Sequence, residues 1–204
     1  MNQPKSAIQR YAAEFIAVLA LTLTVSLSIS ADIDFAFATP IAAAFTLGLF
    51  IYTIGPISGG HINPAITLGL FLNGKHSLKD TIGYLIAQFA GAAVTMYTLK
   101  LVNLSPEVVV ANTYDMGIIE LMGTFFLAFG VASVVWGKAT KSASGIVIGG
   151  SLFLGIITAS AAGSAGILNP AVAVGLGAAN WYYILGPILG AYVATALYSG
   201  LARD

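Results

Sequence analysis

Two long stretches of this chain contain no Lys, Arg, Asp or Glu: residues 35–74, which are 40 positions, and residues 142–202, which are 61 positions. Charged residues form 8% of the 204 residues, whereas a soluble domain carries about 25%. A helix of about 20 predominantly apolar residues is long enough to cross the hydrocarbon core of a bilayer. The chain is therefore predicted to be an all-α membrane protein whose surface faces lipid.

The positions of the charged residues predict six membrane-spanning helices. Three shorter uncharged runs each fit one span. The 40-residue stretch has room for one span and a segment about half as long, and the 61-residue stretch has room for two spans and another such segment. The expected spans are residues 10–31, 38–56, 80–102, 115–137, 145–163 and 181–202.

Positively charged residues are distributed asymmetrically over the predicted connections. One side of the membrane holds a single cation and four acidic residues: Lys100, Asp32, Asp34, Glu107 and Asp115. The other side holds both termini and the remaining cations: Lys5, Arg10, Lys75, Lys79, Lys138, Lys141 and Arg203. Since Lys and Arg are concentrated on the cytoplasmic side of membrane proteins, we expect a multi-pass protein of the cytoplasmic membrane with both termini in the cytoplasm. Residues 1–31 resemble a secretory signal peptide, but their apolar run is long for one, so no cleavage is expected.

The tripeptide Asn-Pro-Ala occurs twice, at residues 63–65 and 169–171, which are 169 − 63 = 106 positions apart. Glu14 and Glu120, each near the start of a predicted span, have the same separation, 120 − 14 = 106. These matches indicate a duplication, with halves of about residues 1–105 and 106–204 in a single transmembrane domain 1–204. Each half has three spans, an odd number, so the second half enters the membrane upside down and forms an inverted repeat.

Each tripeptide begins one of the half-length segments. The apolar turns Ala65–Leu72 and Ala171–Ala178 follow a Pro, which suits the first turn of a helix, and an Asn, which suits its N-cap. We expect two reentrant half-helices that start near the middle of the membrane, where irregular backbone must be buried in protein or line a water-filled cavity. The helix dipoles would repel cations there, and the amides of Asn63 and Asn169 would donate hydrogen bonds to a passing solute.

The stretch Ser58–Thr67, together with the second tripeptide, resembles the two signatures of the aquaporin and glycerol-facilitator family, the major intrinsic proteins. The resemblance covers essentially the whole chain. It implies a passive channel for water and small uncharged solutes, and a homotetramer with one pore in each subunit. It also implies a pore centre formed by Asn63, Pro64, Ala65, Asn169, Pro170 and Ala171.

In the family, an outer constriction selects the solute, and the matching positions here are all apolar: Ala43, Ile157, Gly166 and Val172. Most members have an arginine where this chain has Val172. Replacing a guanidinium by an isopropyl group removes five donors and a permanent charge. Water-selective members have an aromatic side chain where this chain has Ala43. We therefore predict a wide, apolar outer filter that favours larger neutral solutes over water. The resemblance to metalloid-conducting members that lack the arginine implies metalloid acids such as arsenous acid as candidate solutes, alongside glycerol, urea and water.

Several residues allow two interpretations. His61 either lines the pore or packs as a neutral ring under the loop, and further pore-lining candidates are Gly59, Gly60, Ser164 and Tyr183. Glu14 and Glu120 either hold the reentrant loops by accepting hydrogen bonds or act as proton relays of a secondary transporter, which is the alternative function. We expect neither an enzyme nor a metal or cofactor, because the chain has no Cys, two His and no clustered ligands. No basic cluster is dense enough to predict a nucleic-acid partner.

Overall fold

The computed structural model describes residues 5–31 and 34–203, so Asp32, one of the predicted outer acidic residues, lies outside the described part. Within these two ranges the chain forms eight α-helices and no strand. Six of them are long and apolar enough to cross a membrane: α1 (Ala7–Ser30), α2 (Ala38–Ser58), α4 (Leu78–Leu101), α5 (Tyr114–Val135), α6 (Ser144–Ala161) and α8 (Trp181–Leu201). These bounds confirm the six predicted spans to within three residues at each end.

Two short helices, α3 (Pro64–Leu72) and α7 (Pro170–Gly175), correspond to the predicted half-helices, and a 3₁₀ turn, η1 (Lys141–Ala143), precedes α6. The expectation that the second half-helix runs to Ala178 was wrong. Gly177 has a positive φ of 70°, and its N–H donates to the carbonyl of Val174 at 3.0 Å, while the N–H of Ala178 donates to that of Ala173 at 2.9 Å. This pair of hydrogen bonds is a Schellman cap, which ends α7 after Gly175.

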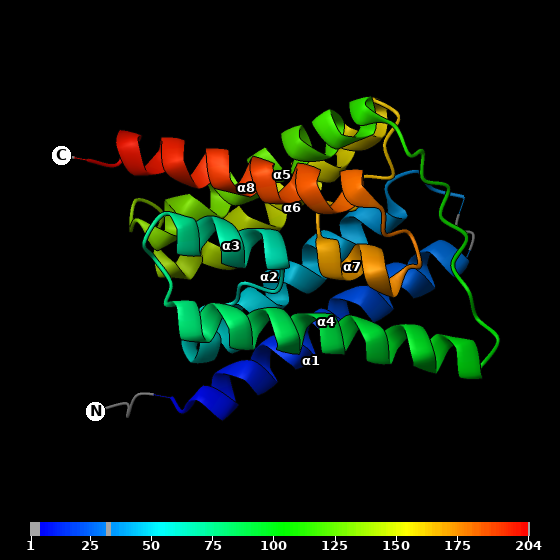
Figure 1. Cartoon of the computed structure of the whole chain (residues 1–204), viewed down its shortest axis with the longest axis horizontal. Coiled ribbons are helices and arrows are strands. Elements are labelled where there is room, and N and C mark those ends of the chain that lie inside the picture. The colour runs from blue at the N-terminus through cyan, green and yellow to red at the C-terminus, as the bar shows by residue number, and fades with distance from the viewer. Residues whose placement is uncertain (1–4, 32–33, 204) are drawn as a thin grey trace.

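The short helices lie in the interior of the bundle. Figure 1 shows α3 and α7 between α8 and α4, with α3 toward the end of the bundle that holds the start of α1 and the end of α8. We call this the terminal end, and the opposite one the far end. α3 packs against α8, and α7 packs against α4. The connection from α4 to α5, residues 102–113, runs along the far end (Figure 1).

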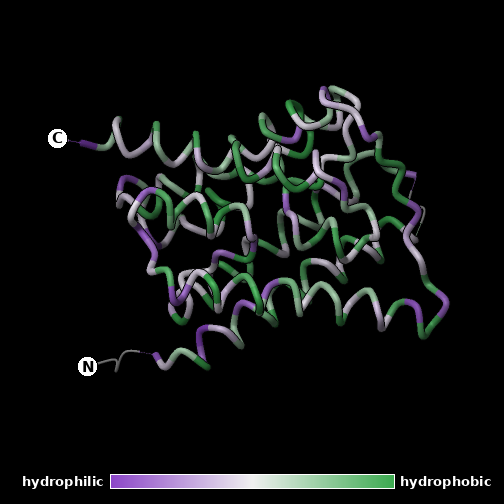
Figure 2. Tube along the Cα trace, viewed as in Figure 1, coloured by the Kyte–Doolittle hydropathy of each residue, from purple (hydrophilic) through white to green (hydrophobic). Residues whose placement is uncertain are grey.

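The outer surface of the bundle is apolar along its length. Figure 2 shows hydrophobic residues along the long helices and hydrophilic ones gathered toward the two ends. Large apolar side chains point outward, among them Ile8 at 80%, Phe45 at 77% and Ile86 at 67% exposure. Exposed apolar area of this extent is a liability in water and is stabilising in lipid. The chain is therefore a multi-pass membrane protein.

Glycines allow the long helices to approach one another closely. A Cβ at Gly190 of α8 would lie 2.2 Å from the carbonyl oxygen of Leu121 in α5. A Cβ at Gly91 of α4 would lie 2.5 Å from the carbonyl oxygen of Phe15 in α1. Small residues at such contacts let membrane helices gain van der Waals packing without a hydrophobic driving force between them. This packing holds the frame within which α3 and α7 are buried.

Candidate functional site

The two short helices begin at matching caps in the centre of the bundle. Asn63 is the N-cap of α3, and its Oδ1 accepts a hydrogen bond from the N–H of Ala65 at 2.8 Å. Asn169 is the N-cap of α7, and its Oδ1 accepts from the N–H of Ala171 at 3.1 Å and from that of Val172 at 3.4 Å. These caps satisfy N–H groups that would otherwise lack partners in the first turn of each helix.

The side chains of the two asparagines also bond across the centre. Asn63 Nδ2 donates to the carbonyl of Leu168 at 2.9 Å, and Asn169 Nδ2 donates to the carbonyl of Ile62 at 3.0 Å. Ile62 and Leu168 both have φ of 54°, the left-handed region that side-chain-bearing residues rarely adopt. An amide nitrogen carries two N–H donors, so each asparagine retains one donor besides this cross-bond.

Glu14 of α1 is completely buried and accepts four hydrogen bonds. Its Oε1 accepts from Ser58 Oγ at 2.7 Å and from the N–H of His61 at 2.9 Å, and its Oε2 accepts from the N–H of Ile62 at 2.7 Å and from Gln88 Nε2 at 2.8 Å. Two of these donors, the N–H groups of His61 and Ile62, belong to the segment just before α3, and Ser58 is the last residue of α2. The carboxylate thus organises that segment from behind, as the loop-supporting interpretation requires.

Glu120 of α5 occupies the equivalent place before α7. It accepts from the N–H of Ile167 at 3.1 Å, from the N–H of Leu168 at 2.7 Å and from the hydroxyl of Ser164. Gln88 has no counterpart in this half, because Ala194 stands at 88 + 106 = 194. Neither Glu14 nor Glu120 belongs to the wall of the cavity described next.

A cavity with a volume of about 70 Å³ for water-sized molecules runs between the long helices and past the starts of α3 and α7. A single water needs on the order of 10–15 Å³ on this measure, so several fit. Most of the wall is apolar, with contributions such as Leu21, Leu47, Leu127 and Leu152. Its polar side chains are Thr39, His61, Asn63 and Asn169.

Three of the four predicted filter residues, Ala43, Gly166 and Val172, line this cavity, but Ile157 does not. Its neighbour Ile156 lines the cavity instead and is only 8% exposed. One residue along an α-helix turns a side chain by about 100° around the axis. Ile157 is therefore not part of this cavity's wall, and Ile156 is the residue that α6 contributes to the wall near Gly166.

The remaining candidates divide into two groups. Gly60 and His61 line the cavity, whereas Gly59, Ser164 and Tyr183 are absent from its wall. Tyr183 is fully buried, and its hydroxyl lies 3.2 Å from Ser164 Oγ and accepts from the N–H of Ala165 at 3.2 Å. Ser164 and Tyr183 therefore contact the loop before α7 from behind. The tripeptide residues behind the asparagines are buried and likewise outside the wall: Pro64, Ala65, Pro170 and Ala171.

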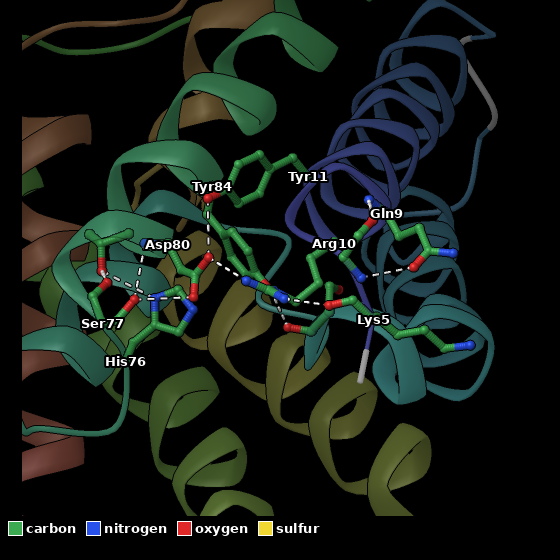
Figure 3. Close-up of polar contacts among 11 residues, drawn as sticks. Lys5, Gln9, Arg10, Tyr11, His76, Ser77, Asp80 and Tyr84 are labelled. Carbon is green, nitrogen blue, oxygen red and sulfur yellow. Dashed lines mark hydrogen bonds and ion pairs between the residues drawn. The ribbon is translucent and has the colours of Figure 1, made fainter. Parts of the chain in front are cut away.

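A cluster of rings lies at the terminal end of the cavity. The ring centroid of His61 is 4.5 Å from that of His76 and 5.0 Å from that of Tyr84. His76 belongs to the connection between α3 and α4, and burial lowers the pKa of its imidazole, although the nearby Asp80 partly raises it. Asp80 in turn pairs with Arg10 at 2.6 Å and accepts from the Tyr11 hydroxyl at 3.1 Å (Figure 3). The first and fourth helices are tied together at this end.

Comparisons with known proteins agree with this architecture. The chain is 30% identical over 171 residues to Nodulin-26 of Glycine max and covers 63% of that protein with 78% of its own length. It is 31% identical over 191 residues to Aquaporin AqpM of Methanothermobacter thermautotrophicus, with coverage of 82% of this chain and 77% of the relative. The solved structure of the aquaglyceroporin from Plasmodium falciparum superimposes with a TM-score of 0.74 at 16% identity, over 97% of this chain and 96% of that one.

The chain thus spans 63% of the length of Nodulin-26 and 60% of that of Aquaporin NIP1-1 of Arabidopsis thaliana. A family model described as Major intrinsic protein matches residues 1–198. This match covers nearly all of the sequence, including both tripeptides, five of the long helices completely and the sixth, α8, as far as residue 198. The chain belongs to the major intrinsic protein family.

Proposed function

We propose that this protein is a passive transmembrane channel whose path is the central cavity. The observation that carries the proposal is the meeting of two helix N-termini at one apolar cavity, each with an asparagine amide beside it. A solute that loses its water in the apolar wall finds hydrogen-bond donors from Asn63 and Asn169 at the centre. Selected donors within an otherwise apolar passage favour small uncharged molecules.

The same arrangement supports exclusion of cations. Each helix start carries roughly half a positive charge, and the two starts face the same cavity. Among the described residues that line it, His61 is the one with a titratable side chain. A cation would therefore meet positive potential without a compensating carboxylate.

A secondary transporter is favoured less. Such a protein couples solute movement to an ion, and Glu14 and Glu120 are the intramembrane carboxylates available for this. All oxygens of both groups accept hydrogen bonds from the segments before α3 and α7. These carboxylate oxygens already accept hydrogen bonds from the protein, and they lie outside the cavity wall. They are therefore poorly placed to bind a coupling ion.

We further propose that Ala43, Ile156, Gly166 and Val172 form the selective constriction, with Ile156 in place of the predicted Ile157. None of these side chains can donate a hydrogen bond. Water would lose hydrogen-bond partners there. Glycerol, urea or undissociated arsenous acid would lose fewer hydrogen bonds relative to the size of the molecule. The asymmetry of Lys and Arg supports a cytoplasmic location for the terminal end, in a cytoplasmic membrane. By similarity to the family, the assembly would be a homotetramer.

The test is stopped-flow light scattering on liposomes that contain the purified protein. We expect slow shrinkage in an impermeant osmolyte and fast re-swelling in an inward gradient of glycerol, urea or arsenous acid. Val172→Arg should speed water and slow the larger solutes, because it adds donors and bulk. Val109→Arg is the matched control, since Val109 is 93% exposed. Fast water flux without re-swelling would refute the solute assignment.

A further inference from the structure

The connection between α4 and α5 is extended and contributes to the cavity. Residues 104–112 form no helix or strand, and the segment runs along the far end of the bundle (Figure 1). Pro106, Val108 and Val110 are partly buried, while Glu107 and Val109 between them are exposed. Alternation with a period of two is expected of an extended chain that rests one face on a surface. The segment therefore presents one regular face to the bundle.

Val108 is the residue of this segment that reaches the cavity wall. Val108 and Val110 both pack against the buried apolar core, but only Val108 lines the cavity. Ile29, one residue before the end of α1, and Thr39, the second residue of α2, line the same cavity. These helix ends place Val108 at the mouth of the cavity at the far end.

We infer that Val108 is a further specificity-determining residue, which narrows the far mouth with an apolar side chain. The inference rests on the proposed function, because it assigns a role in the same path. The constriction has little bulk of its own, because the small side chains of Val172 and Ala43 stand where most family members have an arginine and water-selective members have an aromatic residue. At the far mouth, the isopropyl group of Val108 supplies bulk without hydrogen-bond donors. A solute would be selected at Val108 by its size and by how few hydrogen bonds it loses.

The chain contains no Cys, so a single introduced thiol can be modified selectively. We would prepare Val108→Cys and, as the matched control, Val109→Cys, the neighbour that points away from the bundle. Both would be reconstituted in liposomes and treated with a bulky neutral methanethiosulfonate. Solute re-swelling by Val108→Cys should fall toward the level of empty liposomes after treatment and recover with a reducing agent. Val109→Cys should be modified to the same extent with no change in flux.

Val108→Ala provides a second measurement that does not depend on chemical access. Removal of two methyl groups should raise the glycerol rate relative to the urea rate, while Val109→Ala leaves the ratio of the two rates unchanged. If the untreated protein conducts solutes but the Val108 variants behave like the Val109 variants, Val108 does not determine specificity. If the unmodified protein conducts no more than empty liposomes, the proposed function itself is wrong, and the two failures are thereby distinguished.

Discussion

The side-chain amide of Asn63 donates to the carbonyl of Leu168 at 2.9 Å and thereby joins the cap of α3 to the loop that precedes α7. The reciprocal bond runs from Asn169 to Ile62 at 3.0 Å. The left-handed backbone at Ile62 and at Leu168 turns each carbonyl toward the opposite asparagine. Each half of the chain therefore completes the loop of the other, and the two caps are held as one unit.

Asn169→Asp should weaken this unit without a change of shape. A carboxylate cannot donate to the carbonyl of Ile62, and two oxygens would then face each other in a buried place. The loss of a buried partner costs about 1–3 kcal/mol, and we expect a lower melting temperature in detergent by circular dichroism. The negative charge would also reduce the positive potential of the two helix N-termini. Cation leakage into dye-loaded liposomes should therefore increase. Asn103→Asp, at an exposed position on a connection, is the control.

Glu14→Gln should destabilise the protein because it replaces one acceptor oxygen with a donor amide. The four groups that surround Glu14 all donate to it, so at least one of them would lose its partner. The expected loss is about 1–3 kcal/mol of unfolding free energy, which denaturant titration would measure. Glu107→Gln, on the exposed face of the far-end connection, should have no effect.

Solute flux by the folded protein should be independent of an imposed proton gradient. The carboxylates of Glu14 and Glu120 hold the loops and lie outside the cavity wall, so they have no route to bind and release protons during transport. Re-swelling rates would be compared in liposomes with and without a pH difference across the membrane. Accumulation of solute driven by that difference would instead support the secondary transporter.

Acidification should loosen the terminal end of the bundle. Burial lowers the pKa of His76 in the folded state, whereas the unfolded chain keeps a value of about 6.5. Below that pH the unfolded state binds more protons, so stability falls as the pH falls and is retained above it. We expect the melting temperature to drop between pH 7.5 and pH 5.5, and the drop to be smaller in His76→Gln. An equal drop in both proteins would show that His76 does not contribute.

Gly190→Ala should disrupt the contact between α5 and α8. The added Cβ would lie 2.2 Å from the carbonyl oxygen of Leu121, so the helices must separate. Overpacking of this kind typically costs about 1–3 kcal/mol. Gly200→Ala in the same helix meets nothing within 4 Å and should be neutral or slightly stabilising, because Ala favours the helix by about 1 kcal/mol over Gly. Thermal unfolding of the two variants in one detergent would compare them directly.

The six spans, the two half-helices and their inversion were all determined by the sequence. Charge placement delimits apolar helices because a charged side chain is costly in lipid, and the offset of 106 positions between Asn63 and Asn169 reveals the repeat. Asn followed by Pro specifies the start of a helix locally, through an N-cap side chain and a fixed φ. These features need no knowledge of distant contacts.

Which side chains face the cavity depends on how the helices pack together. In α6 most residues are apolar on every side of the helix, so the pattern does not distinguish the face that turns inward, and Ile156 rather than Ile157 lines the cavity. Tyr183 likewise supports a loop, although an aromatic residue near a pore suits either role. Val108 lies in a connection whose course depends on packing against the helix ends. Local chemistry specifies where helices begin and end. Contacts between residues far apart in the chain decide which side of a mostly apolar helix faces the cavity and which path a connection follows.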